Sequence, residues 1–173
     1  RHARRRPEGD GMTAAIEHLP RRAADVQDLL AVEQRLAALS AEDDLAVGQV
    51  NVDIDRHFPA YDEEWRPPAD AIFKFFDPEG GGCWWGTGRT RPIEPIAAGE
   101  DVYHAEIVGV SPLFTLRFED AVRLIPGPDW VLSLQWSPEA WVACLWRERQ
   151  GLICSGEAAG AAHAVCLAAI RAH

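Results

Sequence analysis

The sequence predicts an α+β fold, a layered α/β sandwich in which an antiparallel sheet is flanked by N-terminal and C-terminal helices. Three observations support this prediction. Apolar residues recur at helical spacing near the N-terminus, two strand-like segments are joined by a short turn in the C-terminal half, and an alanine-rich segment ends the chain. Since helical patterns come first and strand patterns follow, the helices and the sheet are expected to form separate layers.

The first helix is expected to begin near Pro20, because proline is favoured at the first position of a helix. Beyond it, five apolar residues recur at spacings close to three and four, namely Val26, Leu29, Leu30, Leu36 and Leu39. Ser40 is then predicted to cap a second helix. Acidic residues follow it and would lie at the positive end of that helix.

The segment VNVDID at residues 50–55 gives conflicting signals. It alternates between apolar and polar residues and is rich in β-branched side chains, which favours a strand. Val47, Val50, Ile54 and Phe58, however, fall on one stripe of a helix. We prefer the helix because the acidic start supports it.

Short strands and loops are expected in the middle of the chain. The pattern predicts a loop at 59–68, strands at 71–76, 83–85 and 102–110, and a short helix at 119–125. Pro126 ends that helix.

The clearest element is a hairpin formed by residues 130–136 and 141–147. Pairing Trp136 with Trp141 would hold the register, because aromatic cross-strand pairs stabilise a sheet. This register predicts a core-facing side formed by Trp130, Leu132, Leu134, Trp136, Trp141, Ala143 and Leu145. From Glu157 onward, the alanine-rich segment predicts a helix whose small side chains allow it to lie close to the sheet.

Length and charge limit the function classes. The 173 residues suit one domain, and we expect residues 1–14 to be disordered, with Met12 as the true start, and 15–173 to fold. A net charge of -10 disfavours nucleic acid as a partner. The sequence lacks an apolar run long enough for a membrane span, so no membrane association is expected. The four scattered cysteines favour an intracellular protein with reduced thiols.

The stretch GGGCWWGTGRT at residues 80–90 resembles a phosphate-binding loop. Such a loop requires a following helix, which Pro92 and Pro95 prevent here. A hairpin or loop tip is the preferred interpretation. A binding surface formed by Trp84, Trp85 and Arg89 is the alternative, with at most one of the adjacent tryptophans in the core because neighbours on a strand face opposite sides.

Cys154, His163 and Cys166 are candidate metal ligands, because His163 and Cys166 lie three residues apart on the last predicted helix. No motif supplies a fourth ligand, so packing is the preferred role and no cofactor is expected.

Nucleophilic catalysis could use Cys83 with Asp101 and His104, or Cys154 with His163, but no nucleophile-elbow pattern is present. Asp53 and Asp55 would not face each other on a helix and are expected on a solvated acidic face.

The C-terminal half resembles the phage ABA sandwich domain family of short bacteriophage and prophage proteins. The residues that carry the resemblance are Leu124-Ile125-Pro126, Trp130, Trp141-Val142-Ala143 and residues 164–172. The resemblance implies helix-sheet-helix layering and a phage or prophage origin, and it implies no catalytic residues. Residues 59–109 have no counterpart in this pattern and are expected to be an insertion.

We therefore expect a non-catalytic phage or prophage accessory protein that binds another protein or assembles with itself, in the bacterial cytoplasm or in the virion. One alternative is a small metal- or cysteine-dependent enzyme. Another is a glycan-binding module that uses Trp84 or Trp85.

Overall fold

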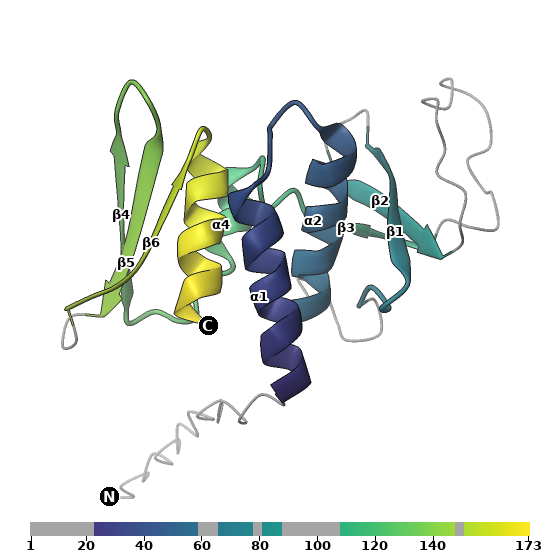
Figure 1. The fold of residues 1–173 in the computed structure, drawn as a ribbon, viewed down its shortest axis with the longest axis horizontal. Helices are drawn as coiled ribbons and strands as arrows, with labels where there is room; N and C mark the ends of the chain where they lie inside the picture. The colour runs from purple at the N-terminus through teal and green to yellow at the C-terminus, as the bar shows by residue number, and fades with distance from the viewer. Residues whose placement is uncertain (1–22, 59–65, 78–80, 88–107, 148–150) are drawn as a thin grey trace, which may run out of the picture.

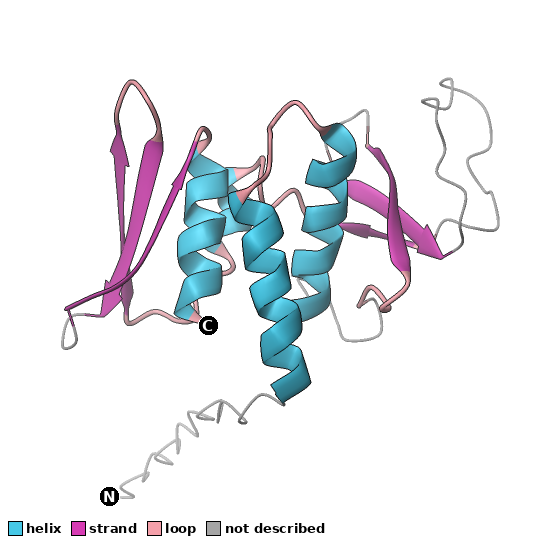
Figure 2. Cartoon of the chain, in the orientation of Figure 1, coloured by secondary structure: helices cyan, strands magenta, loops and turns pink. Residues whose placement is uncertain are grey.

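The computed structural model describes residues 23–58, 66–77, 81–87, 108–147 and 151–173. Within these residues it has four helices and two three-stranded antiparallel sheets (Figures 1 and 2). The helices are α1 (Ala23–Ala37), α2 (Asp44–His57), α3 (Phe118–Val122) and α4 (Ala161–Ala172). Sheet A consists of β1 (Ala71–Phe76), β2 (Cys83–Thr87) and β3 (Gly109–Ser111), and sheet B of β4 (Trp130–Trp136), β5 (Trp141–Arg147) and β6 (Gly151–Ala158).

The α+β class and the antiparallel pairing are confirmed, but the strands form two sheets where the sequence predicts one. Figure 1 shows α4, α1 and α2 between the two sheets. Helix α4 packs against β5 and β6, whereas α2 packs against β1. The strands before α3 therefore cover α2 and do not extend the later hairpin.

Helix α2 confirms the helical interpretation of residues 50–55, but the predicted cap is wrong. Asp43 caps the helix by accepting a hydrogen bond of 3.0 Å from the Ala46 N–H. Ser40 lies in the preceding turn. The helix is buried on opposite sides: Val50 and Ile54 join one core with α4, and Val52 joins a second core with sheet A.

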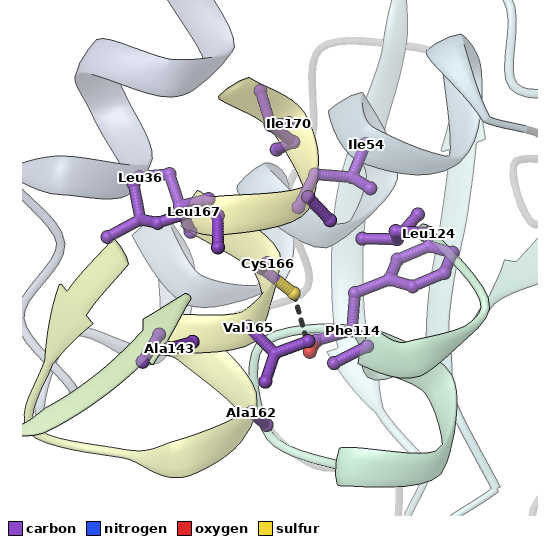
Figure 3. Packing of buried hydrophobic residues seen from close by; sticks show 14 of the residues in the cluster. Leu36, Ile54, Phe114, Leu124, Ala143, Ala162, Val165, Cys166, Leu167 and Ile170 are labelled. Carbon is purple, nitrogen blue, oxygen red and sulfur yellow. Dashed lines mark hydrogen bonds between the residues drawn. The ribbon is translucent and has the colours of Figure 1, made fainter. Parts of the chain in front are cut away.

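The larger core gathers apolar side chains from all four helices and from β5 (Figure 3). Gly156 of β6 lies under α4. A Cβ atom at this position would be 2.2 Å from the Ala164 carbonyl oxygen and 2.6 Å from the Leu167 Cβ. This contact agrees with the expectation that small side chains bring the last helix close to a sheet.

Sheet B has the predicted hairpin register, with Trp136 opposite Trp141. Strand β6 was not predicted, and the last helix begins at Ala161, not at Glu157. Placing Trp136 in the core was also wrong, because 66% of its surface is exposed. Trp130 and Trp141 do pack against the core.

Several predictions fall outside the described residues. They concern the disorder of 1–14 and the start at Met12, most of the loop at 59–68, the strand at 102–107, and Arg89, Asp101 and His104. The predicted insertion at 59–109 supplies β1, β2 and the first residue of β3. Where the chain is described, no helix is long and apolar enough to cross a membrane.

Candidate functional site

Within the stretch at 80–90, the structure describes residues 81–87, of which Cys83–Thr87 form β2. Trp85 points into the core of sheet A and is 2% exposed. Trp84 lies on the opposite side, half-buried, and stacks on Phe75 with 6.2 Å between ring centroids. The prediction that at most one of the two tryptophans joins the core is confirmed. Trp84 therefore remains the only one of this pair that a ligand could touch directly.

Cys83 is fully buried next to Asp55 and Ser111. The Ser111 hydroxyl donates a 2.7 Å hydrogen bond to the Asp55 carboxylate, and Cys83 is paired with Ser111 across β2 and β3. Burial, and then the negative charge of Asp55, raise the pKa of the Cys83 thiol far above its usual range. Because the thiolate is the nucleophile, this environment opposes catalysis by Cys83.

The three candidate metal ligands are held by different contacts. His163 Nε2 lies 2.7 Å from the Leu36 carbonyl oxygen at the end of α1, and the Cys166 thiol donates to the Phe114 carbonyl at 2.8 Å (Figure 3). Cys154 lies on β6. No cluster of three potential ligands occurs in the described parts of the chain. The hydrogen bonds of His163 and Cys166 connect α4 to its neighbours, in agreement with the packing role.

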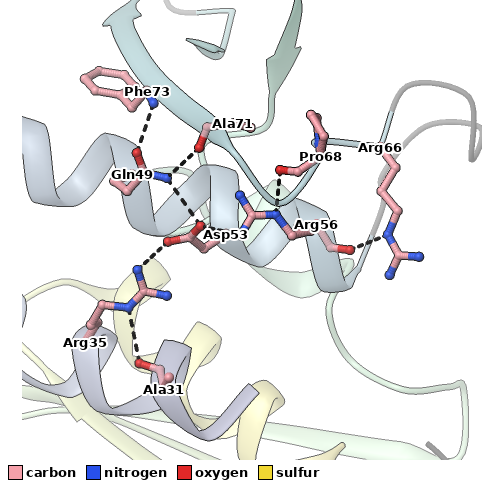
Figure 4. A network of polar contacts seen from close by, with 9 residues as sticks. All are labelled: Ala31, Arg35, Gln49, Asp53, Arg56, Arg66, Pro68, Ala71 and Phe73. Atoms are coloured by element: carbon pink, nitrogen blue, oxygen red, sulfur yellow. Dashed lines mark hydrogen bonds and ion pairs between the residues drawn. The ribbon is translucent and has the colours of Figure 1, made fainter. Parts of the chain in front are cut away.

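Asp53 is not on a solvated acidic face, and that prediction is wrong for Asp55 as well. Asp53 is 2% exposed and accepts a 2.6 Å hydrogen bond from Arg35 of α1 (Figure 4). Its second oxygen lies 3.0 Å from an Arg56 nitrogen and 3.3 Å from Gln49 Nε2. Helix α2 is covered by α1 on one side and by sheet A on the other, so neither carboxylate faces solvent.

Gln49 extends this network to the first strand. Its side-chain amide donates to the Ala71 carbonyl at 3.2 Å and accepts from the Phe73 N–H at 3.0 Å (Figure 4). The two contacts satisfy backbone groups of β1 and join it to α2. The network is therefore a structural link among α1, α2 and sheet A.

A depression of about 460 Å³ lies between the α1–α2 turn and the start of α4. His163 lies in its wall together with Glu157 and the exposed apolar side chains of Leu116 and Phe118. Burial lowers the pKa of His163, while its contact with the Leu36 carbonyl opposes this shift. The depression combines the His163 imidazole with a single carboxylate, that of Glu157, and no cysteine or serine lines it.

Comparisons with protein-family models, with curated proteins and with solved structures found no match to this chain. The resemblance to the phage ABA sandwich domain family rests on the residues that carry it and stays a prediction.

Trp136, the last residue of strand β4, is the largest exposed aromatic side chain among the described residues. Among the residues that the structure describes, strand β4 is an edge of sheet B and pairs with β5 alone. Its apolar residues are only partly covered, because α4 packs over β5 and β6. Val131 on the outer side is 37% exposed, and Trp136 on the inner side is 66% exposed. We call residues 130–136, with their free edge, the β4 surface.

Sequence reasoning missed this surface because it placed every apolar residue of the inner side in the core. One signal was available in the segment WVLSLQW, which contains no charged residue and no proline. Strand edges exposed to water usually carry such residues, which prevent pairing with other chains. Their absence is typical of a strand whose edge is covered.

Proposed function

We propose that this is a non-catalytic accessory protein that binds a protein chain through the β4 surface. The observation that carries the proposal is the 66% exposure of Trp136 at the end of an uncharged edge strand. Tryptophan is enriched among residues that dominate binding energy at protein interfaces. In contrast, Cys83, His163 and Cys166 are buried and hydrogen-bonded to the backbone.

The origin and architecture form part of the same proposal. We propose a phage or prophage protein, in the bacterial cytoplasm or in the virion, with a layered sandwich fold. Only the architecture draws support from the structure, because Leu124, Ala143 and residues 164–170, which carry the resemblance, are buried. Flanking phage structural genes would support the origin, and their absence on both sides would count against it.

Photo-cross-linking tests the binding function. A photoreactive amino acid replaces Trp136, and the protein is irradiated in the cells that naturally produce it. We expect a discrete covalent adduct, because Trp136 would lie in the interface. Mass spectrometry of the adduct identifies the partner as another protein or as a second 19.1 kDa chain.

The matched control places the same photoreactive group at Leu45 of α2, which is also exposed and apolar, at 46%. This position is outside the β4 surface and should give no discrete adduct. If Trp136 and Leu45 give the same diffuse background, the β4 surface is not a binding site and the proposed function fails.

Glycan binding is the second candidate, and the outward position of Trp84 favours it. Its ring stacks on Phe75 with an interplanar angle of 22°, and both side chains are half-buried on the side of β2 away from the core of sheet A. Aromatic side chains can stack on sugar rings. Glycan-array binding that is lost in Trp84→Ala and retained in Trp136→Ala would support this function, whereas no binding by the native protein would exclude it for the glycans tested.

A further inference from the structure

The four edges of the two sheets differ in how they are protected. Edge strand β1 has a register shift around Lys74, and β3 has only three residues. Edge strand β6 contains a register shift opposite Leu145 and the charged residue Glu157. Short length, irregular register and charge all prevent pairing with another strand. Strand β4 has seven residues in regular register and none of these features.

The sequence of β4 is nearly symmetric about Ser133. Reading WVLSLQW outward from Ser133, Leu132 corresponds to Leu134 and Trp130 to Trp136. A two-fold axis through Ser133 would therefore place Leu132 of one copy opposite Leu134 of the other, and Trp130 opposite Trp136. The remaining pair is Val131 with Gln135. Since no position is charged, the pairing brings no like charges together in a chain of net charge -10.

The backbone of β4 allows this arrangement. The Ser137 N–H donates to the Ala140 carbonyl at 2.9 Å, which makes that pair a hydrogen-bonded one. Because bonded and non-bonded pairs alternate along an antiparallel ladder, Leu132 and Leu134 direct their N–H and C=O groups away from β5. If two copies pair antiparallel about Ser133, the N–H and C=O groups of Leu132 in each copy form hydrogen bonds with those of Leu134 in the other.

We propose that the partner of the β4 surface is a second copy of this chain, paired antiparallel through β4 about Ser133 into a six-stranded sheet. This inference rests on the proposed function and names its partner. Residues opposite each other in an antiparallel pair lie on the same side of the sheet. The α4 helices of both copies therefore lie on one side, and Trp136 of each copy lies beside Trp130 of the other.

The register follows from the pattern of the two sides. A shift by one residue would place the inner side of one copy opposite the outer side of the other. A shift by two residues keeps the sides matched but places Trp130 or Trp136 opposite a residue beyond the strand. The register about Ser133 matches both sides and pairs all seven residues.

Introducing a charge of either sign at the two-fold axis tests the proposal. In the proposed dimer Ser133 faces its own copy at a non-bonded pair, where the Cα atoms are about 4.5 Å apart. Ser133→Glu and Ser133→Lys each place like charges opposite one another. We expect sedimentation equilibrium to show a dimer for the native protein, and a dissociation constant raised by about tenfold or more in either variant. An equimolar mixture of the two variants should recover the dimer as a heterodimer.

The matched controls are Ser155→Glu and Ser155→Lys, which place the same charges on exposed β6 and should leave the dimer unchanged. Circular dichroism checks that all variants fold. A native protein that is monomeric throughout the concentration series would overturn the proposal, as would dimers insensitive to both Ser133 variants or a mixture that fails to recover. A monomer whose Trp136 photo-adduct contains a different protein would overturn self-pairing while leaving the proposed function intact.

Discussion

Arg35 of α1 and Asp53 of α2 form an ion pair of 2.6 Å in which the carboxylate is buried and the arginine side chain is half exposed. The same carboxylate accepts contacts from Arg56 and Gln49, and Gln49 bonds to β1. Asp53 thus lies where α1, α2 and sheet A meet. Its carboxylate accepts hydrogen bonds from several side chains at once and so connects these elements.

Asp53→Ala is expected to lower the free energy of unfolding by about 2 kcal/mol, because it leaves the Arg35 and Arg56 guanidinium groups without their shared acceptor. Arg35→Ala should cost about 1 kcal/mol or less, since Arg35 is half exposed and Asp53 keeps Arg56 and Gln49. Urea denaturation measures both values. Glu139→Gln in the exposed turn of the hairpin is the control and should change little. Equal costs for Asp53→Ala and Glu139→Gln would contradict the structural role of the network.

Gly156→Ala is expected to destabilise the protein by about 3 kcal/mol, because the new methyl group would meet backbone atoms of α4 that cannot move independently. The nearest is the Ala164 carbonyl oxygen at 2.2 Å. Thermal unfolding measures the change. Gly160→Ala provides the control, since a Cβ at that position has no neighbour within 4 Å. A melting temperature equal to that of the control would mean that α4 does not lie close to β6.

The protein should lose stability as the pH falls below the ordinary histidine pKa of 6.5, because His163 has a lowered pKa in the fold. In that range the unfolded chain binds a proton that the folded chain does not, so the free energy of unfolding decreases with falling pH. The stabilisation is fully present above pH 6.5 and declines toward the lower folded pKa. His163→Gln should flatten this dependence between about pH 7 and pH 5 in urea titrations. An unchanged slope in the variant would show that His163 is not held neutral by burial.

Cys83 and Cys166 should resist alkylation in the native protein at about pH 8 and react only after unfolding. Burial raises the pKa of both thiols, and the charge of Asp120 adds to the effect at Cys166. Cys144 on the outer side of sheet B is half-buried and should react first. Mass spectrometry of the labelled peptides gives the order. Rapid labelling of Cys83, or a zinc content near one per chain, would favour the cysteine- or metal-dependent enzyme.

Periodic segments were predictable from the sequence, and close approaches between elements were not. Residues 44–57 and the hairpin register followed from local patterns that the structure retains. Strand β6 was missed because Gly151, Ser155 and Gly156 are typical of loops, while Gly156 is required by the contact with α4. The division into two sheets depends on which helix each strand covers, and local patterns do not contain that information.

The candidate site shows the same limit. Alternation correctly separated Trp84 from Trp85, because neighbouring strand residues must face opposite sides. It also placed Trp136 with Trp130 and Trp141 on one side of sheet B, which is their observed arrangement. Whether that side is covered depends on where α4 lies, and α4 packs over β5 and β6. The exposure of Trp136 was therefore visible only in three dimensions.

Amide hydrogen exchange of β4, resolved to single residues, measures directly whether the β4 edge pairs with another strand. If the β4 edge is the binding surface and its partner is a second copy, the Leu132 and Leu134 amides become protected as the protein concentration rises. The Val131 and Ser133 amides, which face β5, should be protected throughout. If Leu132 and Leu134 exchange at the rate of unprotected amides at every concentration, and also in the presence of any protein cross-linked at position 136, then the β4 edge is not paired and the protein does not bind a partner through it.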